Sequence, residues 1–180
     1  MKRTCIAWRV AVTMAASALA ASALAQPDAA GEQTMRRNWY DDPFVALSRD
    51  VAECPLPLGP WMTRAEMEDD AHYRAERGTT CWLAHRCTKP NSYLYDAPIA
   101  AAAKAHFAGS TRLSGTSLWI TVQRRFVYVE GCADASFDRA ALLRELAALP
   151  DVEQVFVRIT DDPRRSVPYK TRAQPDRAPN

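Results

Sequence analysis

The sequence predicts an α+β fold in which one α-β-β-α-β core, residues 96–161, follows a helical, disulfide-linked N-terminal extension, residues 38–95. Three observations lead to this prediction. Residues 117–130 alternate apolar and polar side chains, as a hairpin with one buried face does. Apolar residues at helical spacing lie on both sides of that stretch. An even number of cysteines remains after an expected N-terminal cleavage.

The first 25 residues have the features of a secretory signal peptide. Lys2 and Arg3 precede a short apolar stretch, and Ala23-Leu24-Ala25 forms a small-residue cleavage site. We expect cleavage after Ala25, export to the periplasm and no transmembrane segment in the mature chain. The signal contains three of the 23 Lys and Arg residues and none of the 21 acids, so the mature net charge is −1. This balance gives no reason to expect a nucleic-acid partner.

The extension is expected to be mainly helical. Residues 26–37 are polar and aperiodic, which predicts a disordered arm. Phe44, Leu47 and Val51 fall at helical spacing after Pro43 and predict a short helix. The sequence of residues 63–66 then matches a capping box, and the helix that it starts is expected to end at Gly78, because glycine tolerates a left-handed stop.

The core is expected to contain two helices and three strands. Asp96 is the expected cap of the first helix, and Ser136 is the expected cap of the second. Between them lies the hairpin, whose turn is Arg124-Arg125, and a third strand follows Pro150. Residues 162–180 are rich in proline and are expected to form a disordered tail. The expected core positions are Ile99, Ala103, Phe107, Leu118, Ile120, Val122, Val127, Val129, Leu142 or Leu143, Leu146, Leu149, Val155, Val157 and Ile159.

Four cysteines remain in the mature chain: Cys54, Cys81, Cys87 and Cys132. In an exported chain of this size they predict two disulfides, and the sequence leaves all three pairings open. A zinc site formed by Cys54, Cys81, His85 and Cys87 is the alternative, but C-x3-H-x-C is not a usual zinc spacing. We expect no metal and no cofactor.

No catalytic motif accompanies the histidines. His72, His85 and His106 are spread over three expected elements, and no G-x-S-x-G segment is present. The acids between Glu66 and Asp70 are more simply explained as charges near a helix N-terminus. We therefore expect a protein that is not an enzyme.

Two groups of residues are candidates for binding. Trp119, Phe126, Tyr128 and Phe156 are expected to share the sheet face opposite the two core helices, either as an interaction surface or as a platform that the extension covers. Arg124 and Arg125 are expected at the hairpin tip, where they either contact lipid phosphates or form a solvated turn.

The hairpin, second helix and last strand together resemble the BON domain family of bacterial envelope proteins. Its hairpin pattern, V-x-V-x-x-G-x-V-x-L-x-G, is matched by Ile120, Val122, Val127, Val129 and Gly131, and its G-V-x-x-V strand by Val152 and Val155. Two positions depart from the pattern. Arg124-Arg125 replaces a glycine-containing turn, so a different or longer turn is expected there, and Asp151 stands where the family has glycine.

The resemblance implies a non-enzymatic periplasmic domain that binds phospholipid or supports envelope integrity. The alternative is a protein-protein interaction module of the cell envelope that uses the aromatic sheet face or the cysteine-containing extension.

Overall fold

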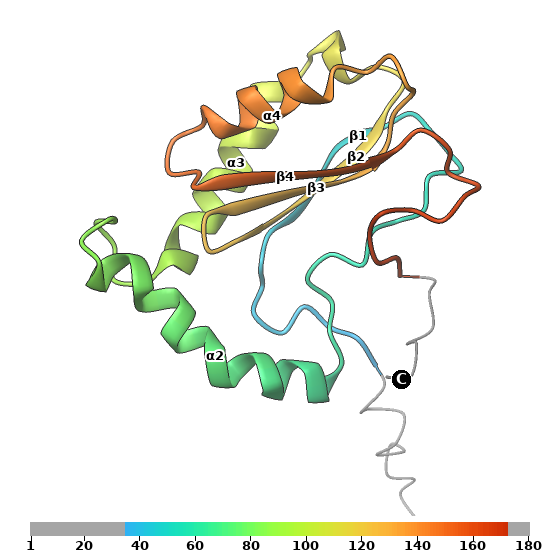
Figure 1. Cartoon of the computed structure of the whole chain (residues 1–180). Coiled ribbons are helices and arrows are strands. Elements are labelled where there is room, and N and C mark those ends of the chain that lie inside the picture. Colours follow the sequence, from blue (N-terminus) through green and yellow to red (C-terminus); the bar gives the residue numbers. More distant parts are fainter. Residues whose placement is uncertain (1–34, 173–180) are drawn as a thin grey trace, which may run out of the picture.

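The computed structural model describes residues 35–172 and has an α+β architecture. The expected signal peptide and most of the expected arm, together with residues 173–180 of the tail, lie outside the described residues. Three α-helices and a four-stranded sheet make up the described part (Figure 1). These elements are β1 (Phe44–Arg49), α2 (Arg64–Leu83), α3 (Asp96–Phe107), β2 (Ser117–Gln123), β3 (Phe126–Cys132), α4 (Arg139–Ala147) and β4 (Gln154–Thr160), with short 3-10 helices η1 (Ser92–Tyr95) and η2 (Thr111–Leu113).

The sheet has the strand order β1-β2-β3-β4. The first two pairings are antiparallel and β3 pairs with β4 in parallel, so α4 forms the crossover between the last two strands. Helices α3 and α4 lie on one face of the sheet (Figure 1). Ile99, Ala103 and Phe107 from α3, and Leu142 and Leu146 from α4, pack there against the even-numbered residues of β2 and the odd-numbered residues of β3 and β4. The expected core stripe of the first core helix is therefore confirmed.

The prediction of a helix over Phe44, Leu47 and Val51 is wrong. Residues 44–49 form β1, which extends the sheet beyond the expected hairpin. Val45 and Leu47 pack against the core, while Phe44 and Ala46 have partners on the other sheet face, Thr121 and Trp119. Pairing with β2 satisfies the backbone groups of a segment too short to form a stable helix by itself.

Helix α2 begins as expected and ends later than expected. Thr63 and Glu66 form the capping box, with the Thr63 hydroxyl accepting from the Glu66 N–H. The helix continues through Gly78 to Leu83. A Cβ atom at Gly78 would lie 2.7 Å from Asn91 Oδ1, so this glycine permits close approach of the next segment and does not stop the helix.

A buried ion pair fastens α2 to the sheet. Arg74 Nη1 donates to Asp42 Oδ2 at 3.1 Å, and Gln123 at the end of β2 donates to the same oxygen at 2.7 Å. The guanidinium lies between two aromatic rings, with its carbon 3.9 Å from the centre of Tyr40 and 3.7 Å from that of Tyr93. Because Asp42 is only 4% exposed, Arg74 supplies the charge that permits its burial.

Two segments near the limits of the described residues are more ordered than expected. Arg37 pairs with Met62, although it belongs to the expected arm. Residues 162–172, expected in the tail, run beside residues 51–60, which we call the strap (Figure 1). Tyr169 is 6% exposed and donates to Pro55 O at 2.9 Å. The proline content predicted disorder here, but side-chain burial and backbone pairing with the strap hold this segment.

Two of the expected helix caps are also different. Asp138, not Ser136, caps α4, and its carboxylate accepts from the Ala141 N–H at 2.8 Å. Asp96 lies inside the first turn of α3, and its side chain makes no cap; its carboxylate accepts from the N–H groups of Arg124 and Arg125. Only the difference at Asp96 results from a tertiary contact. Ser136 instead donates its N–H and its hydroxyl to Asp134 Oδ1, two residues earlier in the chain.

Candidate functional site

The expected aromatic residues do share one sheet face. Register alignment places Phe44, Thr121, Tyr128 and Phe156 in one row across all four strands. The rings of Tyr128 and Phe156 are stacked with centroids 5.0 Å apart, and Phe126 meets Phe156 edge-on at 6.1 Å. This face is opposite the one that α3 and α4 cover.

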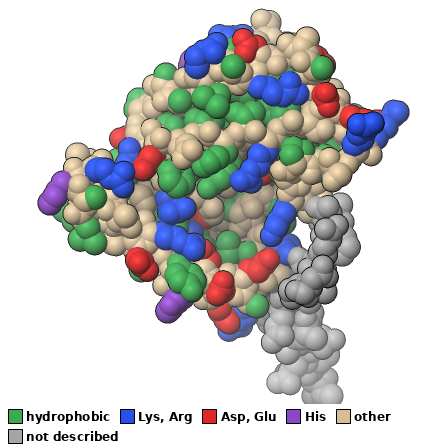
Figure 2. All heavy atoms as spheres, in the orientation of Figure 1, with side chains coloured by type: hydrophobic (Ala, Val, Ile, Leu, Met, Phe, Trp, Pro, Cys, Tyr) green, Lys and Arg blue, Asp and Glu red, His purple; other side chains and the backbone are tan. Residues whose placement is uncertain are grey.

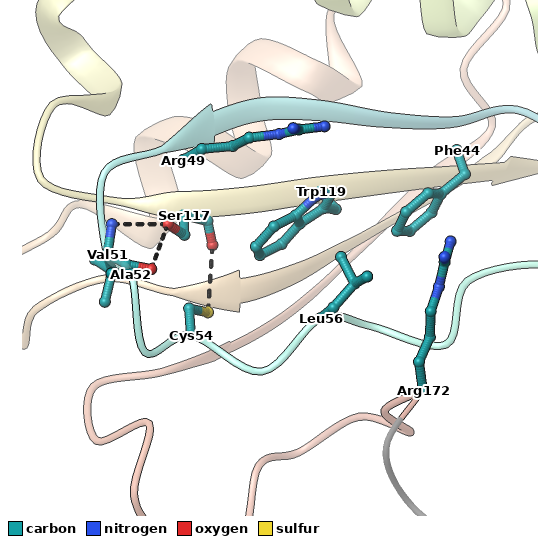
Figure 3. Close-up of a pocket in the computed structure, with 9 residues that line it drawn as sticks. All are labelled: Phe44, Arg49, Val51, Ala52, Cys54, Leu56, Ser117, Trp119 and Arg172. Carbon is teal, nitrogen blue, oxygen red and sulfur yellow. Dashed lines mark hydrogen bonds between the residues drawn. The ribbon is translucent and has the colours of Figure 1, made fainter.

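Burial of this face is uneven. Trp119 is 7% exposed, whereas Phe126, Tyr128 and Phe156 are each partly exposed. Cys54 and Leu56 of the strap line the same groove as Trp119 (Figure 3). The strap thus covers the Trp119 end of the face, and the three rings nearer the hairpin turn keep contact with solvent.

A buried acid lies beside Trp119 on this face. Glu130, opposite Trp119 in register, is 8% exposed and pairs with Arg158 at 3.4 Å. Burial raises its pKa, and the Arg158 charge opposes that shift. Tyr169 lies nearby, and its own burial together with the Glu130 charge raises the pKa of its hydroxyl to about 12. These groups belong to the packing of the strap end of the sheet.

The two hairpin arginines are in different surroundings. Arg125 is committed to intramolecular contacts: its Nε donates to Asp151 O at 2.8 Å, and Nη1 lies 3.5 Å from Glu153 Oε2. Arg124 lies over the Phe126 ring at 5.1 Å. The pair therefore does not form a free double guanidinium site, and Arg124 is the more available of the two.

The cysteines form two disulfides, Cys54–Cys132 and Cys81–Cys87. The first ties the strap to the end of β3 with Cα atoms 5.8 Å apart. The second joins the last turn of α2 to the loop after it. All four sulfur atoms are in disulfides, so none of them is a thiolate for the alternative zinc site. Residues 35–172 contain no cluster of three or more metal-ligating side chains.

The second disulfide braces a projecting surface that the sequence interpretation missed. We call residues 77–95 the stapled tip; they lie at the left of Figure 1, at the end of α2. Three large apolar side chains are exposed there: Trp82 at 44%, Leu83 at 72% and Leu94 at 53%. The buried Tyr95 hydroxyl accepts from the N–H groups of Thr88 and Lys89 at 2.8 and 2.7 Å, so the tip is a defined structure.

The stapled tip also carries only positive charges. Arg77, Arg86 and Lys89 lie within it, and no aspartate or glutamate occurs between Glu76 and Asp96. Figure 2 shows basic and hydrophobic side chains together on this projection. Arg77 and Arg86 form exposed ion pairs with Asp70 and Glu153, contacts that are weak in water. The acid-free stretch and the Trp82-Leu83 pair were the sequence signals that could have revealed the tip.

One histidine lies beside an acid at the surface. His106 Nε2 is 3.1 Å from Glu145 Oε2, which also contacts Arg112. The adjoining hollow has a volume of about 180 Å³, and no hydroxyl or thiol side chain lines it. The residues that surround the hollow therefore include no nucleophile for the histidine to activate.

Comparison with protein-family models, with curated proteins and with solved structures finds no match for this chain. No helix within residues 35–172 is both long and apolar enough to span a bilayer.

Proposed function

We propose that this protein is a non-enzymatic binding protein of the bacterial envelope, with a BON-like core, that attaches to anionic phospholipid surfaces. The order α3-β2-β3-α4-β4 supports the BON-like assignment, because it is the order that the resemblance implies. Asp151 supports it too: its φ of 66° is the left-handed conformation that glycine adopts at ease. The signal-peptide pattern and the disulfides favour an oxidising compartment such as the periplasm.

The observation that carries the lipid proposal is the stapled tip. The tip combines exposed tryptophan and leucine side chains with neighbouring Arg and Lys side chains. Side chains of these two kinds together favour the interface between water and lipid headgroups. Each basic residue near an anionic surface contributes about 1 kcal/mol, and an apolar side chain that leaves water contributes about 1.5 to 3 kcal/mol when fully buried. Together these contributions are enough for reversible attachment.

Flotation of the purified, oxidised protein with vesicles tests this proposal. We expect binding to phosphatidylglycerol-containing vesicles at low salt and much weaker binding to pure phosphatidylcholine. Leu83→Asp removes an exposed apolar side chain and adds an acid to the tip, so it should weaken binding by at least about tenfold. The residue is 72% exposed, so the variant should fold.

Leu143→Asp is the matched control. Leu143 is also an exposed leucine, at 40%, but it lies on α4. The Leu143→Asp variant should bind vesicles like the wild type. Equal binding by Leu83→Asp and the wild type, or absence of binding to anionic vesicles at low salt, would reject the lipid proposal.

A protein-interaction role remains the second candidate, and the aromatic stack of Phe126, Tyr128 and Phe156 favours it. Partly exposed stacked rings are typical of interaction surfaces. A pull-down from envelope extract after detergent removal of lipid tests it, with Phe156→Ser as the variant. Capture of one defined protein that Phe156→Ser abolishes and Leu83→Asp leaves intact would favour this role over the first.

A further inference from the structure

A groove beside Trp119 is separate from the stapled tip and has the properties of a ligand site. Its volume is about 400 Å³, which is within the usual range for small-molecule sites. Three parts of the chain meet there: β1 with the strap, β2, and the last described residues (Figure 3). The lining residues are Phe44, Arg49, Val51, Ala52, Cys54, Leu56, Ser117, Trp119 and Arg172.

The walls of the groove are aromatic. Trp119 and Phe44 lie on neighbouring strands of the same sheet face, and the small Ala46 stands opposite Trp119 in register. Phe44 is held edge-on against Trp61, with ring centroids 5.2 Å apart. A flat apolar ligand would therefore meet rings whose positions are already fixed by packing.

A β-bulge directs Arg49 into this groove. The register of β1 against β2 shifts between Ala46 and Ser48. In a regular strand Arg49 would share a face with Val45 and Leu47, which pack against the core. The extra residue instead puts Arg49 opposite Ser117, on the groove face. Bulges commonly redirect a side chain next to a functional site.

Arg172 enters from the other side (Figure 3). Its backbone N–H donates to Leu56 O at 3.1 Å, and its guanidinium carbon lies 3.7 Å from the centre of the Trp61 ring. Stacking on Trp61 orients the guanidinium, and its partial burial lowers its pKa. Arg172 is thus held in position by the strap and by Trp61, the residue that follows the strap.

Neither guanidinium has an acidic partner among residues 35–172. The ion pairs of this region join Arg158 to Glu130 and Arg164 to Glu53 instead. The Ser117 hydroxyl is already occupied, since it accepts from the Val51 N–H at 2.8 Å and donates to Val51 O at 3.0 Å. The polar groups that the groove offers a ligand are therefore two cations.

We propose that this groove binds a small aromatic carboxylate, with its ring beside Trp119 and Phe44 and its carboxylate between Arg49 and Arg172. Guanidinium groups bind carboxylates through paired, charge-assisted hydrogen bonds, and the rings supply the apolar contact. This inference is independent of attachment to lipid.

Titration calorimetry with 2-naphthoate and its neutral analogue 2-naphthamide tests the proposal. We expect saturable naphthoate binding and at least about tenfold weaker binding of the amide, because the amide loses the charge-assisted hydrogen bonds. Arg49→Gln and Arg172→Gln should each weaken naphthoate binding by about tenfold and leave the amide unchanged. Ala52→Phe places a ring in the groove from an exposed position and should abolish both.

Arg144→Gln, on the exposed face of α4, is the control and should bind naphthoate like the wild type. Leu83→Asp should also bind it normally, which separates this site from the stapled tip. The proposal is overturned if naphthoate does not bind saturably, if acid and amide bind equally, or if the two arginine variants and Ala52→Phe retain wild-type affinity.

Discussion

At the scale of single residues, the hairpin turn shows how a side chain far along the chain can determine backbone conformation. Arg124 and Arg125 both have positive φ, 54° and 71°, as in the two-residue turn that normally contains asparagine and glycine. The expectation of a different or longer turn is therefore wrong. Asp96 Oδ2 and Oδ1 accept the two N–H groups at 2.8 and 2.7 Å and stabilise this unfavourable conformation.

The buried Asp96 carboxyl should make stability depend on pH. Its exposure is 2%, and desolvation raises its pKa from 3.8 to about 6 despite the two N–H donors. The pKa of Asp96 is higher in the folded protein than in the unfolded chain, so protonation of this carboxyl stabilises the fold. This contribution to the free energy of unfolding is complete below about pH 3.8 and is lost as the pH rises through 6. The advantage of the wild type over Asp96→Asn in unfolding free energy should grow by on the order of 2 kcal/mol between pH 7.5 and 4.5.

Urea denaturation at the two pH values measures this difference. Thr80→Ala, which changes an exposed residue that does not titrate, is the control and should show no comparable change. An unfolding free-energy difference between wild type and Asp96→Asn that is the same at both pH values would contradict the assignment.

At the scale of elements, propensity and periodicity predicted the hairpin, α3, the start of α2 and β4. These elements have a local signal: alternation, a capping box, or a three- and four-residue apolar stripe. Residues 44–49 had no such unambiguous signal, because Phe44, Leu47 and Val51 suit a helix while strand pairing uses Val45 and Leu47. The available edge of β2 decided the outcome, and that edge exists only in the folded protein.

A substitution at Gly78 distinguishes the effect of helix propensity from the effect of tertiary packing. Helix propensity alone predicts that Gly78→Ala stabilises the protein by about 0.5 to 1 kcal/mol. The structure predicts the opposite, because the new methyl group would displace the Asn91 side chain, whose Oδ1 accepts from the Tyr93 N–H at 3.0 Å. We expect destabilisation by roughly 1 kcal/mol in thermal or urea unfolding.

Thr80→Ala, at an exposed position of the same helix, is the comparison and should be neutral or slightly stabilising. A rise in melting temperature for Gly78→Ala would mean that Asn91 moves aside at no cost.

At the scale of the whole molecule, the two disulfides should differ in their effect. The two cysteines of Cys54–Cys132 have a sequence separation of 78 residues, whereas those of Cys81–Cys87 have a separation of 6 residues. The loop-entropy model then predicts losses of roughly 4.5 and 2.4 kcal/mol when each pair is replaced by serine. The first replacement should also release the strap and Tyr169 from the end of β3.

Chemical denaturation gives the free-energy losses, and hydrogen exchange reports where protection is lost. We expect exchange to increase in the strap and residues 161–172 for Cys54→Ser/Cys132→Ser, and only near the stapled tip for Cys81→Ser/Cys87→Ser. Similar exchange patterns in the two double variants would contradict the separate roles assigned to the bridges.

The sequence predicted the candidate sites only in part, because their surroundings depend on contacts between residues far apart in the chain. The sequence predicted that Trp119, Phe126, Tyr128 and Phe156 share a face, since alternation in a strand follows from covalent geometry. It could not predict which of them the strap covers. The groove depends on a bulge and on Arg172, and the prominence of the stapled tip depends on where α2 ends.

The sequence by itself determined the α+β class, the alternating hairpin, the apolar faces of the core helices and the presence of paired cysteines. These follow from interactions between residues near in the chain and from side-chain chemistry. The tertiary structure decided the fourth strand, the disulfide pairing, the partner of Asp96 and the position of Arg49. Each of these depends on contacts between distant residues, whose energies are realised only when packing brings them together.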